Sequence, residues 1–145
     1  CMCHQCNYEE LLSAADLSAT DNRMRVLEVV GNNSFPLSAK DIFNTLERSI
    51  SINRVTVYRI LDLLVDHGVV ERISTGGRAF YYGLAPNSHH RPHPHFYCLS
   101  CGQMDCLSPE SLTVDMDALI KTFPGKIEKL EIRIDGICKN CRDKQ

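Results

Sequence analysis

The sequence predicts an α+β fold of two small units, a winged helix-turn-helix followed by a compact α/β unit. Two observations carry this prediction. Three helix-type patterns precede two β-prone runs around a glycine turn, and two C-x-x-C pairs lie in the last third of the 145 residues. A chain of this length fits one ordinary domain or two very small ones, and a unit of half that size has little apolar core of its own.

Three helices are predicted in the first half of the chain. Thr20 caps the first, which carries apolar residues at helical spacing until Gly31 ends it. Ser38 caps the second helix, and Ser51 caps the third, which runs to about His67. Each start thus has a side-chain oxygen that accepts a hydrogen bond from the first helical turn.

The third predicted helix has two different faces, because residues three and four positions apart share a side of a helix. The apolar stripe contains Val57, Ile60, Leu61 and Leu64, and the opposite face contains Val55, Arg59, Asp62 and Asp66. The pattern predicts that one face packs against the domain while the other is presented to a partner.

Two β-prone runs follow at residues 69–73 and 79–82, with Gly76 and Gly77 between them. Helix, helix, helix, hairpin is the order of a winged helix-turn-helix, in which the third helix enters the DNA major groove and the hairpin lies beside it as a wing. Any small α/β domain can have the same order, so the pattern alone leaves this alternative open.

A change in composition marks the second unit. Residues 85–92 are rich in Pro, Asn, Ser and His, which is typical of a hinge. We therefore predict a winged-helix domain at 1–84, a hinge at 85–92 and a second domain at 93–145. In that domain we expect a helix from Ser111 to Phe123 and, from its apolar alternation, a strand from Lys126 to Asp135.

The two C-x-x-C pairs are the most specific chemical signal. Four thiolates in such pairs can surround one zinc ion tetrahedrally, and a closed site of this kind has no open position for catalysis. We therefore predict a structural Zn²⁺ site, with unliganded buried thiols as the alternative. The predicted ligands are Cys98, Cys101, Cys138 and Cys141.

Composition restricts the class of protein. No stretch resembles a signal peptide or approaches the roughly 20 apolar residues of a membrane span, so we expect a cytoplasmic protein with no membrane partner. In a reducing compartment, eight cysteines favour metal binding over disulfides. The net charge is −2, and bulk charge therefore gives no support for nucleic-acid binding.

Three motifs resemble those of the ferric-uptake-regulator (Fur) family. Residues 51–61, SINRVTVYRIL, resemble the TVYR recognition helix of that family. The other two motifs are His93-x-His95-x-x-Cys98-x-x-Cys101-Gly102, which resembles its histidine-rich entry into CxxCG, and Gly136-x-Cys138-x-x-Cys141, which resembles its usual ending. The resemblance covers nearly the whole chain after about Thr20.

The resemblance implies a homodimeric, metal-responsive transcriptional repressor of metal-homeostasis genes. Its partner would be a palindromic operator in double-stranded DNA, and it would take no small-molecule substrate. The implied fold is an N-terminal winged helix-turn-helix followed by a small α/β dimerisation domain held by the Cys₄ zinc. A zinc-dependent hydrolase is a remote alternative, because the sequence has no HExxH or comparable catalytic constellation, and we expect no enzyme.

The resemblance also assigns residues to DNA contact. Tyr58 and Arg59 stand at the positions that contact DNA in the family, and Arg54 and Thr56 lie nearby on the early turns of the same helix. Arg59 could reach guanine or phosphate, and Tyr58 could bond to phosphate or touch a thymine methyl group. The alternative is an ordinary solvated helix face.

A regulatory metal site is implied as well. His93 and His95 stand at the family's ligand spacing before Cys98, and two residues apart on an extended segment their side chains point to one side. Cys106 stands where peroxide-sensing relatives commonly place Asp, and Glu71 resembles a position from which zinc-sensing members donate a ligand. This set suits Zn²⁺ better than Fe²⁺ or Mn²⁺. The chain thus most resembles a zinc-uptake-regulator type member, with an iron or peroxide sensor as the alternative.

Several alternatives stay open at this site. Cys106 could be an ordinary buried thiol, and Glu71 could be a solvated strand residue. His89 and His90 are alternative candidates for the histidine ligands, because the hinge is longer than the family norm. A further group at the start of the chain could bind metal, respond to oxidation or have no role, and it consists of Cys1, Cys3, His4 and Cys6.

Overall fold

The computed structural model describes residues 6–87 and 91–144. The chain forms two compact units that divide between Arg91 and Pro92. Residues 88–90 lie outside the described part, so the course of the predicted hinge at 85–92 and the domain limits at 84 and 93 stay predictions. In the described part, no helix is long and apolar enough to span a membrane.

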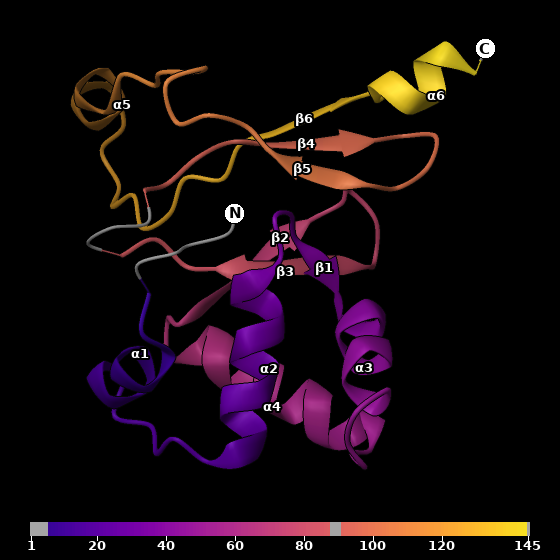
Figure 1. Ribbon diagram of the computed structural model, residues 1–145. Coiled ribbons are helices and arrows are strands. Elements are labelled where there is room, and N and C mark those ends of the chain that lie inside the picture. Colours follow the sequence, from indigo (N-terminus) through magenta and orange to yellow (C-terminus); the bar gives the residue numbers. More distant parts are fainter. Residues whose placement is uncertain (1–5, 88–90, 145) are drawn as a thin grey trace. The chain divides into compact units, whose positions relative to one another are not determined.

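The first unit has four helices on one face of a three-stranded sheet (Figure 1). The sheet has the order β1-β3-β2, and both pairings are antiparallel. Its elements are α1 (Tyr8–Ala14), α2 (Asp21–Asn32), β1 (Leu37–Ser38), α3 (Ala39–Glu47), α4 (Arg54–Asp66), β2 (Val70–Ser74) and β3 (Phe80–Leu84). The predicted helices and hairpin are therefore present, and α1 and β1 are additions.

Two of the three predicted helix caps are correct. The hydroxyls of Thr20 and Ser38 accept hydrogen bonds from the first turns of α2 and α3. The prediction for α4 was wrong, because its cap is Asn53 and not Ser51. Asn53 Oδ1 accepts from the backbone N–H of Thr56 at 2.8 Å, and this satisfies an N–H that would otherwise lack a partner inside the helix.

Helix α1 completes the core of the first unit. Leu12 is fully buried in it, and the Tyr8 hydroxyl donates to Asn32 Oδ1 at 2.6 Å. The Tyr8 ring packs so closely on Gly31 that a Cβ atom there would collide with it. Gly31 therefore lies inside α2 for reasons of packing, and the predicted end of the helix at this residue was one position early.

The apolar stripe of α4 is confirmed. All four of its predicted members are buried, while the four residues predicted for the opposite face are exposed. The stripe packs with residues from α1, α2, α3 and the sheet in one apolar cluster. The first unit therefore has a continuous core that holds the exposed face of α4 in a fixed position.

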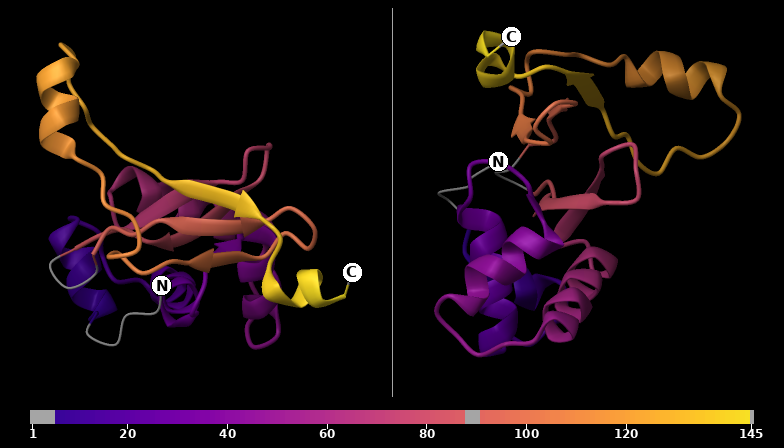
Figure 2. Two further views of the ribbon diagram at one scale, coloured as in Figure 1. Left: turned by 90° about the horizontal axis from the view of Figure 1, so that it is seen from above. Right: turned by 90° about the vertical axis from the view of Figure 1, so that its right-hand side faces the viewer.

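The second unit is a small sheet of order β5-β4-β6, in which β4 pairs antiparallel with β5 and parallel with β6. Helix α5 stands apart from the strands, and α6 follows the end of β6 (Figure 2). The elements are β4 (His95–Cys98), β5 (Met104–Cys106), α5 (Met116–Thr122), β6 (Arg133–Gly136) and α6 (Lys139–Asp143).

Two predicted elements of the second unit are shorter than expected. The helix predicted from Ser111 begins only after Asp115, which caps it by accepting from Ala118 N at 3.0 Å. The strand predicted from Lys126 to Asp135 is regular only at 133–136. Its partner β4 begins at His95, opposite Arg133, so the preceding residues have no strand to pair with.

Candidate metal centres and DNA-facing helix

Four cysteine sulfurs meet at one end of the second sheet. Their Sγ atoms lie within 4.8 Å of one another, and the Cys101 and Cys138 sulfurs are 3.8 Å apart. In a zinc tetrahedron with Zn–S bonds of about 2.3 Å, neighbouring sulfurs are about 3.8 Å apart. The cluster of Cys98, Cys101, Cys138 and Cys141 therefore fits a closed Cys₄ zinc site.

The fold explains why Cys101 and Cys138, which are 37 positions apart in sequence, meet. Gly102 has a φ of 78°, which allows the chain to turn sharply after Cys101. On the other side, β6 runs parallel to β4 with Gly136 opposite Cys98, and Leu99 N donates to Gly136 O at 2.8 Å. The pairing of β4 with β6 thus delivers the second C-x-x-C to the first.

Two thiols of the cluster, Cys98 and Cys141, have opposite pKa shifts. The backbone N–H groups of Cys101 and Cys138 each donate to Cys98 Sγ at 3.4 Å and lower the pKa of Cys98 to about 6, although burial opposes this shift. At Cys141, a hydrogen bond from Ser100 lowers the pKa, but the neighbouring sulfurs and burial raise it to about 11. The Cys98 thiolate is therefore present at neutral pH, and a divalent cation would favour ionisation of Cys141.

A second cluster contains His93, His95 and Cys106. Their ligand atoms lie within 4.8 Å of one another, and the two imidazole rings have centroids 4.7 Å apart. Cys106 lies directly across from His95 in the antiparallel pairing of β5 with β4. His95 is only 4% exposed, and a buried imidazole requires a polar partner such as a metal ion. Strand register therefore joins three of the four predicted regulatory ligands.

The remaining predicted ligands belong to the first unit or lie outside the described residues. Glu71 is half-buried on β2 of the first unit, opposite Gly83, and its participation stays a prediction. His89 and His90 lie outside the described residues, as do Cys1 and Cys3. Cys6 lies 3.6 Å from the Asn87 side-chain nitrogen.

The predicted DNA-contacting residues occupy the first turns of α4. Arg54, Tyr58 and Arg59 are exposed, and Thr56 is half-buried. The Arg54 guanidinium lies 5.3 Å from the centre of the Phe43 ring on α3, which restrains its direction. Val55 in the same turns is 56% exposed although it is apolar.

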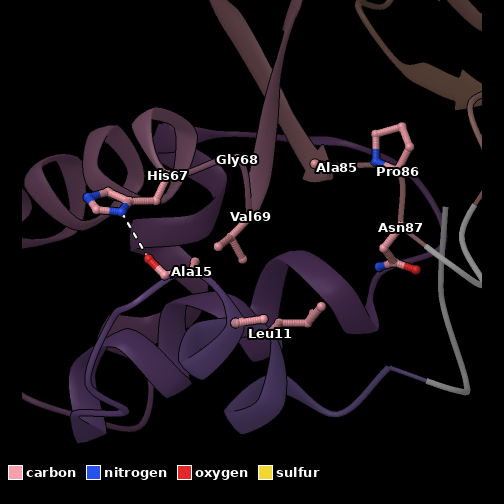
Figure 3. A pocket seen from close by; sticks show the side chains of 9 residues that line it. Leu11, Ala15, His67, Gly68, Val69, Ala85, Pro86 and Asn87 are labelled. Atoms are coloured by element: carbon pink, nitrogen blue, oxygen red, sulfur yellow. Dashed lines mark hydrogen bonds between the residues drawn. The ribbon is translucent and has the colours of Figure 1, made fainter.

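A cavity of about 180 Å³ lies elsewhere in the first unit, beside α1 and the end of α4 (Figure 3). Its lining is mostly apolar, and the His67 ring meets the Ala15 carbonyl oxygen at 3.1 Å. None of the predicted metal or DNA-binding residues lines it.

Comparison with known proteins agrees with this arrangement. The model of the "Ferric uptake regulator family" matches residues 14–134. The chain belongs to this family. The ferric uptake regulation protein of Bacillus subtilis (strain 168) is 31% identical over 137 residues, which cover 92% of this chain and 91% of that protein. Family membership makes this chain a metal-responsive regulator and not an enzyme.

Solved structures have the same fold. The ferric uptake regulator of Helicobacter pylori, described as having three functional metal-binding sites, has a TM-score of 0.75 at 20% identity and covers 97% of each chain. A zinc uptake regulator solved with zinc and DNA has a TM-score of 0.67 at 24% identity, covering 94% of this chain and 91% of that one. At these identities the likeness establishes the fold alone, with its winged helix and second α/β unit.

Proposed function

We propose that this Fur-family chain is a zinc-responsive, homodimeric repressor that binds a palindromic DNA operator and controls metal-homeostasis genes. The choice of zinc rests on one observation. Two imidazoles and one thiol form a cluster at His93, His95 and Cys106. Nitrogen and sulfur ligands in a tetrahedral set suit Zn²⁺, whereas Fe²⁺ and Mn²⁺ favour sites richer in oxygen.

The fourth ligand in this proposal is Glu71. Its carboxylate would complete a tetrahedron of mixed nitrogen, sulfur and oxygen ligands. Because Glu71 belongs to the first unit and the other three ligands to the second, bound zinc would favour one arrangement of the two units. A ligand that binds one state more tightly shifts the population toward that state. Zinc would thereby fix the two α4 helices of a dimer at the spacing of a palindrome.

The proposed DNA surface is the exposed side of α4. Arg59 would bond to guanine or phosphate, Tyr58 to phosphate or a thymine methyl group, and Arg54 and Thr56 would add contacts at the start of the helix. A zinc uptake regulator of the same fold was solved with DNA, which supports this partner. The net charge of −2 requires that affinity come from these local cations.

Exposed apolar residues in the second unit support a homodimer. An apolar surface of this kind is unfavourable in water and is typical of an interface with a second copy. The exposed large apolar side chains there include Leu112, Leu119, Ile120, Phe123, Leu130, Ile134 and Ile137. Helix α5 has no buried residue of its own, so we assign it to the interface between protomers.

A mobility-shift titration under reducing conditions tests the zinc proposal. The wild-type protein should require zinc for operator binding, and Cys106→Ala should raise the zinc concentration at half-saturation by roughly 100-fold. Cys6→Ala is the matched control, because Cys6 is a single cysteine outside both metal clusters. Unchanged zinc dependence in Cys106→Ala would remove this residue from the site.

The fourth ligand needs its own variant. Glu71→Gln should weaken the zinc response, whereas Glu47→Gln, on the exposed surface of α3, should not. The second candidate function is iron sensing, which is favoured by the curated relative in Bacillus subtilis, a ferric uptake regulation protein. If Fe²⁺ activates DNA binding at lower free concentration than Zn²⁺ in the same titration, iron sensing replaces zinc sensing.

A further inference from the structure

A carboxylate lies on the face of α4 that is proposed to meet DNA. Asp62 is three residues after Arg59, so the two side chains share one side of the helix. Its side chain is 63% exposed. A carboxylate near DNA phosphates is repelled by them. Asp62 would therefore weaken DNA binding unless it has another role that offsets this repulsion.

Asp62 is bound to the wing. Arg72 on β2 donates from Nη2 to Asp62 Oδ1 at 2.8 Å, and the Arg72 side chain is 35% exposed. This contact joins the exposed side of α4 to the first strand of the hairpin. It joins two residues ten positions apart, and between them Gly68, with a φ of 73°, makes the turn between helix and strand.

Two aromatic rings hold the guanidinium of Arg72 in this position. Its Cζ atom is 5.4 Å from the centre of the Phe80 ring and 5.9 Å from that of the Tyr82 ring, both on β3. Arg72 and Tyr82 are direct partners in the β2-β3 pairing. One side chain thus contacts α4, β2 and β3, the three elements that make the helix and the wing.

We propose that Arg72 and Asp62 form a positioning pair that sets the direction of the wing relative to the recognition helix α4. This inference rests on the proposed DNA-binding function. Arg78 is exposed at the tip of the wing, directly after Gly76 and Gly77. With the base of the hairpin held against α4, Arg78 stays at a constant distance from Arg59. The pair thereby allows both cations to contact the same half-site.

A direct phosphate contact by Arg72 is the competing explanation. It predicts a different salt dependence when Arg72 is lost and a change in DNA affinity of opposite sign when the Asp62 charge is removed. If Arg72 bound phosphate, its loss would reduce the salt dependence of DNA affinity by about one counterion. Removal of the Asp62 charge would then strengthen DNA binding, because one repulsive group would be gone. A positioning pair requires instead that loss of either partner weakens operator binding and leaves the salt dependence unchanged.

The experiment uses the zinc-saturated full chain and a duplex that the wild-type protein selects from a random library, with a shuffled duplex as the non-specific probe. Asp62→Asn and Arg72→Gln should each weaken binding to the selected duplex roughly fivefold. The double variant should be no weaker than either single variant, and affinity for the shuffled duplex should not change.

Asp66→Asn is the matched control for charge. Asp66 lies one turn further along the exposed side of α4, and no ion pair involves it among the residues that the structure describes. This variant should bind the selected duplex as tightly as wild type or more tightly. Arg72→Lys keeps the charge but loses the planar group that stacks on the rings, so it should recover only part of the lost affinity.

Three outcomes would overturn the positioning pair. They are tighter binding by Asp62→Asn, additive losses in the double variant, and a smaller salt slope in Arg72→Gln. A thermal melt of each variant shows whether the fold is intact, and Arg72→Lys supplies the result if Arg72→Gln is unfolded. Failure of the wild-type protein to select any duplex would instead contradict the proposed DNA-binding function. The proposed role of the Arg72–Asp62 pair would then be contradicted as well.

Discussion

The winged-helix unit buries apolar side chains from all four of its helices, whereas the described residues of the second unit bury only three apolar side chains, those of Pro94, Cys98 and Met104. The first unit therefore has the continuous core that a small domain needs in order to fold alone. The second has a three-stranded sheet, two short helices and many exposed apolar residues. With the proposed zinc sites and dimer, bound metal and a second copy of the chain would supply the missing stability.

This difference also gives the two units different tasks: the first unit positions α4, and the second would respond to metal. The apolar core holds α4 in one place, so the side chains proposed to contact DNA would not depend on metal for their local structure. If the second unit binds zinc as proposed, a change in metal supply would change its population of folded or dimeric states. A unit with a small apolar core suits a sensor, because metal binding would then contribute a large part of its folding free energy.

Removal of the structural zinc should have the largest effect. Structural zinc sites contribute about 10–16 kcal/mol of binding free energy, so Cys138→Ser should unfold the second unit and leave the first folded. Hydrogen exchange of backbone amides would measure this, with loss of protection at 92–144 and retained protection in α2 and α4. Cys6→Ser serves as the control. Equal loss of protection in both units would show that their stabilities are not separable.

A cavity in the first core should have the next largest effect. Leu64→Ala removes a fully buried side chain of α4 and should lower the free energy of unfolding of the first unit by about 2–5 kcal/mol. Denaturant unfolding would measure this, and the zinc content per chain should stay the same. Val55→Ala on the exposed face of the same helix should change stability by less than about 0.5 kcal/mol. A loss of zinc in Leu64→Ala would contradict the separation of the two units.

A charge on the apolar surface of the second unit should separate the protomers. Ile120 on α5 is 62% exposed within one chain. Ile120→Glu would bury an unpaired carboxylate in the proposed interface, so it should raise the dimer dissociation constant by about 100-fold or more. Sedimentation equilibrium would measure this, with Thr113→Glu in a nearby exposed loop as the control. A wild-type chain that is monomeric with zinc bound, or an Ile120→Glu variant as dimeric as wild type, would exclude α5 from the interface.

As the pH falls, zinc binding by the second unit should weaken before the first unit loses its fold. The pKa of Cys98 is lowered to about 6, so its thiolate form is present above that pH and is lost as the pH falls through it. Below pH 6, this ligand alone should cost about tenfold in zinc affinity for each pH unit. Competition with a chromophoric chelator between pH 7.5 and 5 would measure the slope. An affinity that is flat over this range would contradict the proton competition.

Much of the local structure could be predicted because it depends on neighbours in sequence. The buried stripe of α4, the caps at Thr20 and Ser38, and the hairpin around Gly76 follow from helical spacing, side-chain oxygens and glycine turns. The pairing of Cys98 with Cys101 as ligands follows from the C-x-x-C spacing in the same way. In each case a few adjacent residues contain the whole physical cause.

The unpredicted features have causes in distant parts of the chain. Helix α1 forms because Tyr8 and Leu12 pack against α2, and Gly31 is a packing contact and not a helix end. The strand predicted from Lys126 was too long because β4 offers it a partner only from His95 onward. A short apolar run cannot reveal its partner, since spacing alone does not specify which segment lies opposite.

The family, the four-cysteine cluster and the exposed face of α4 could all be read from the sequence, because each is encoded at fixed spacing. Packing placed Cys106 across from His95 and joined Asp62 to the wing through Arg72. These contacts depend on strand register and on the angle between helix and hairpin. Both are set by packing over the whole unit, and no local pattern contains them.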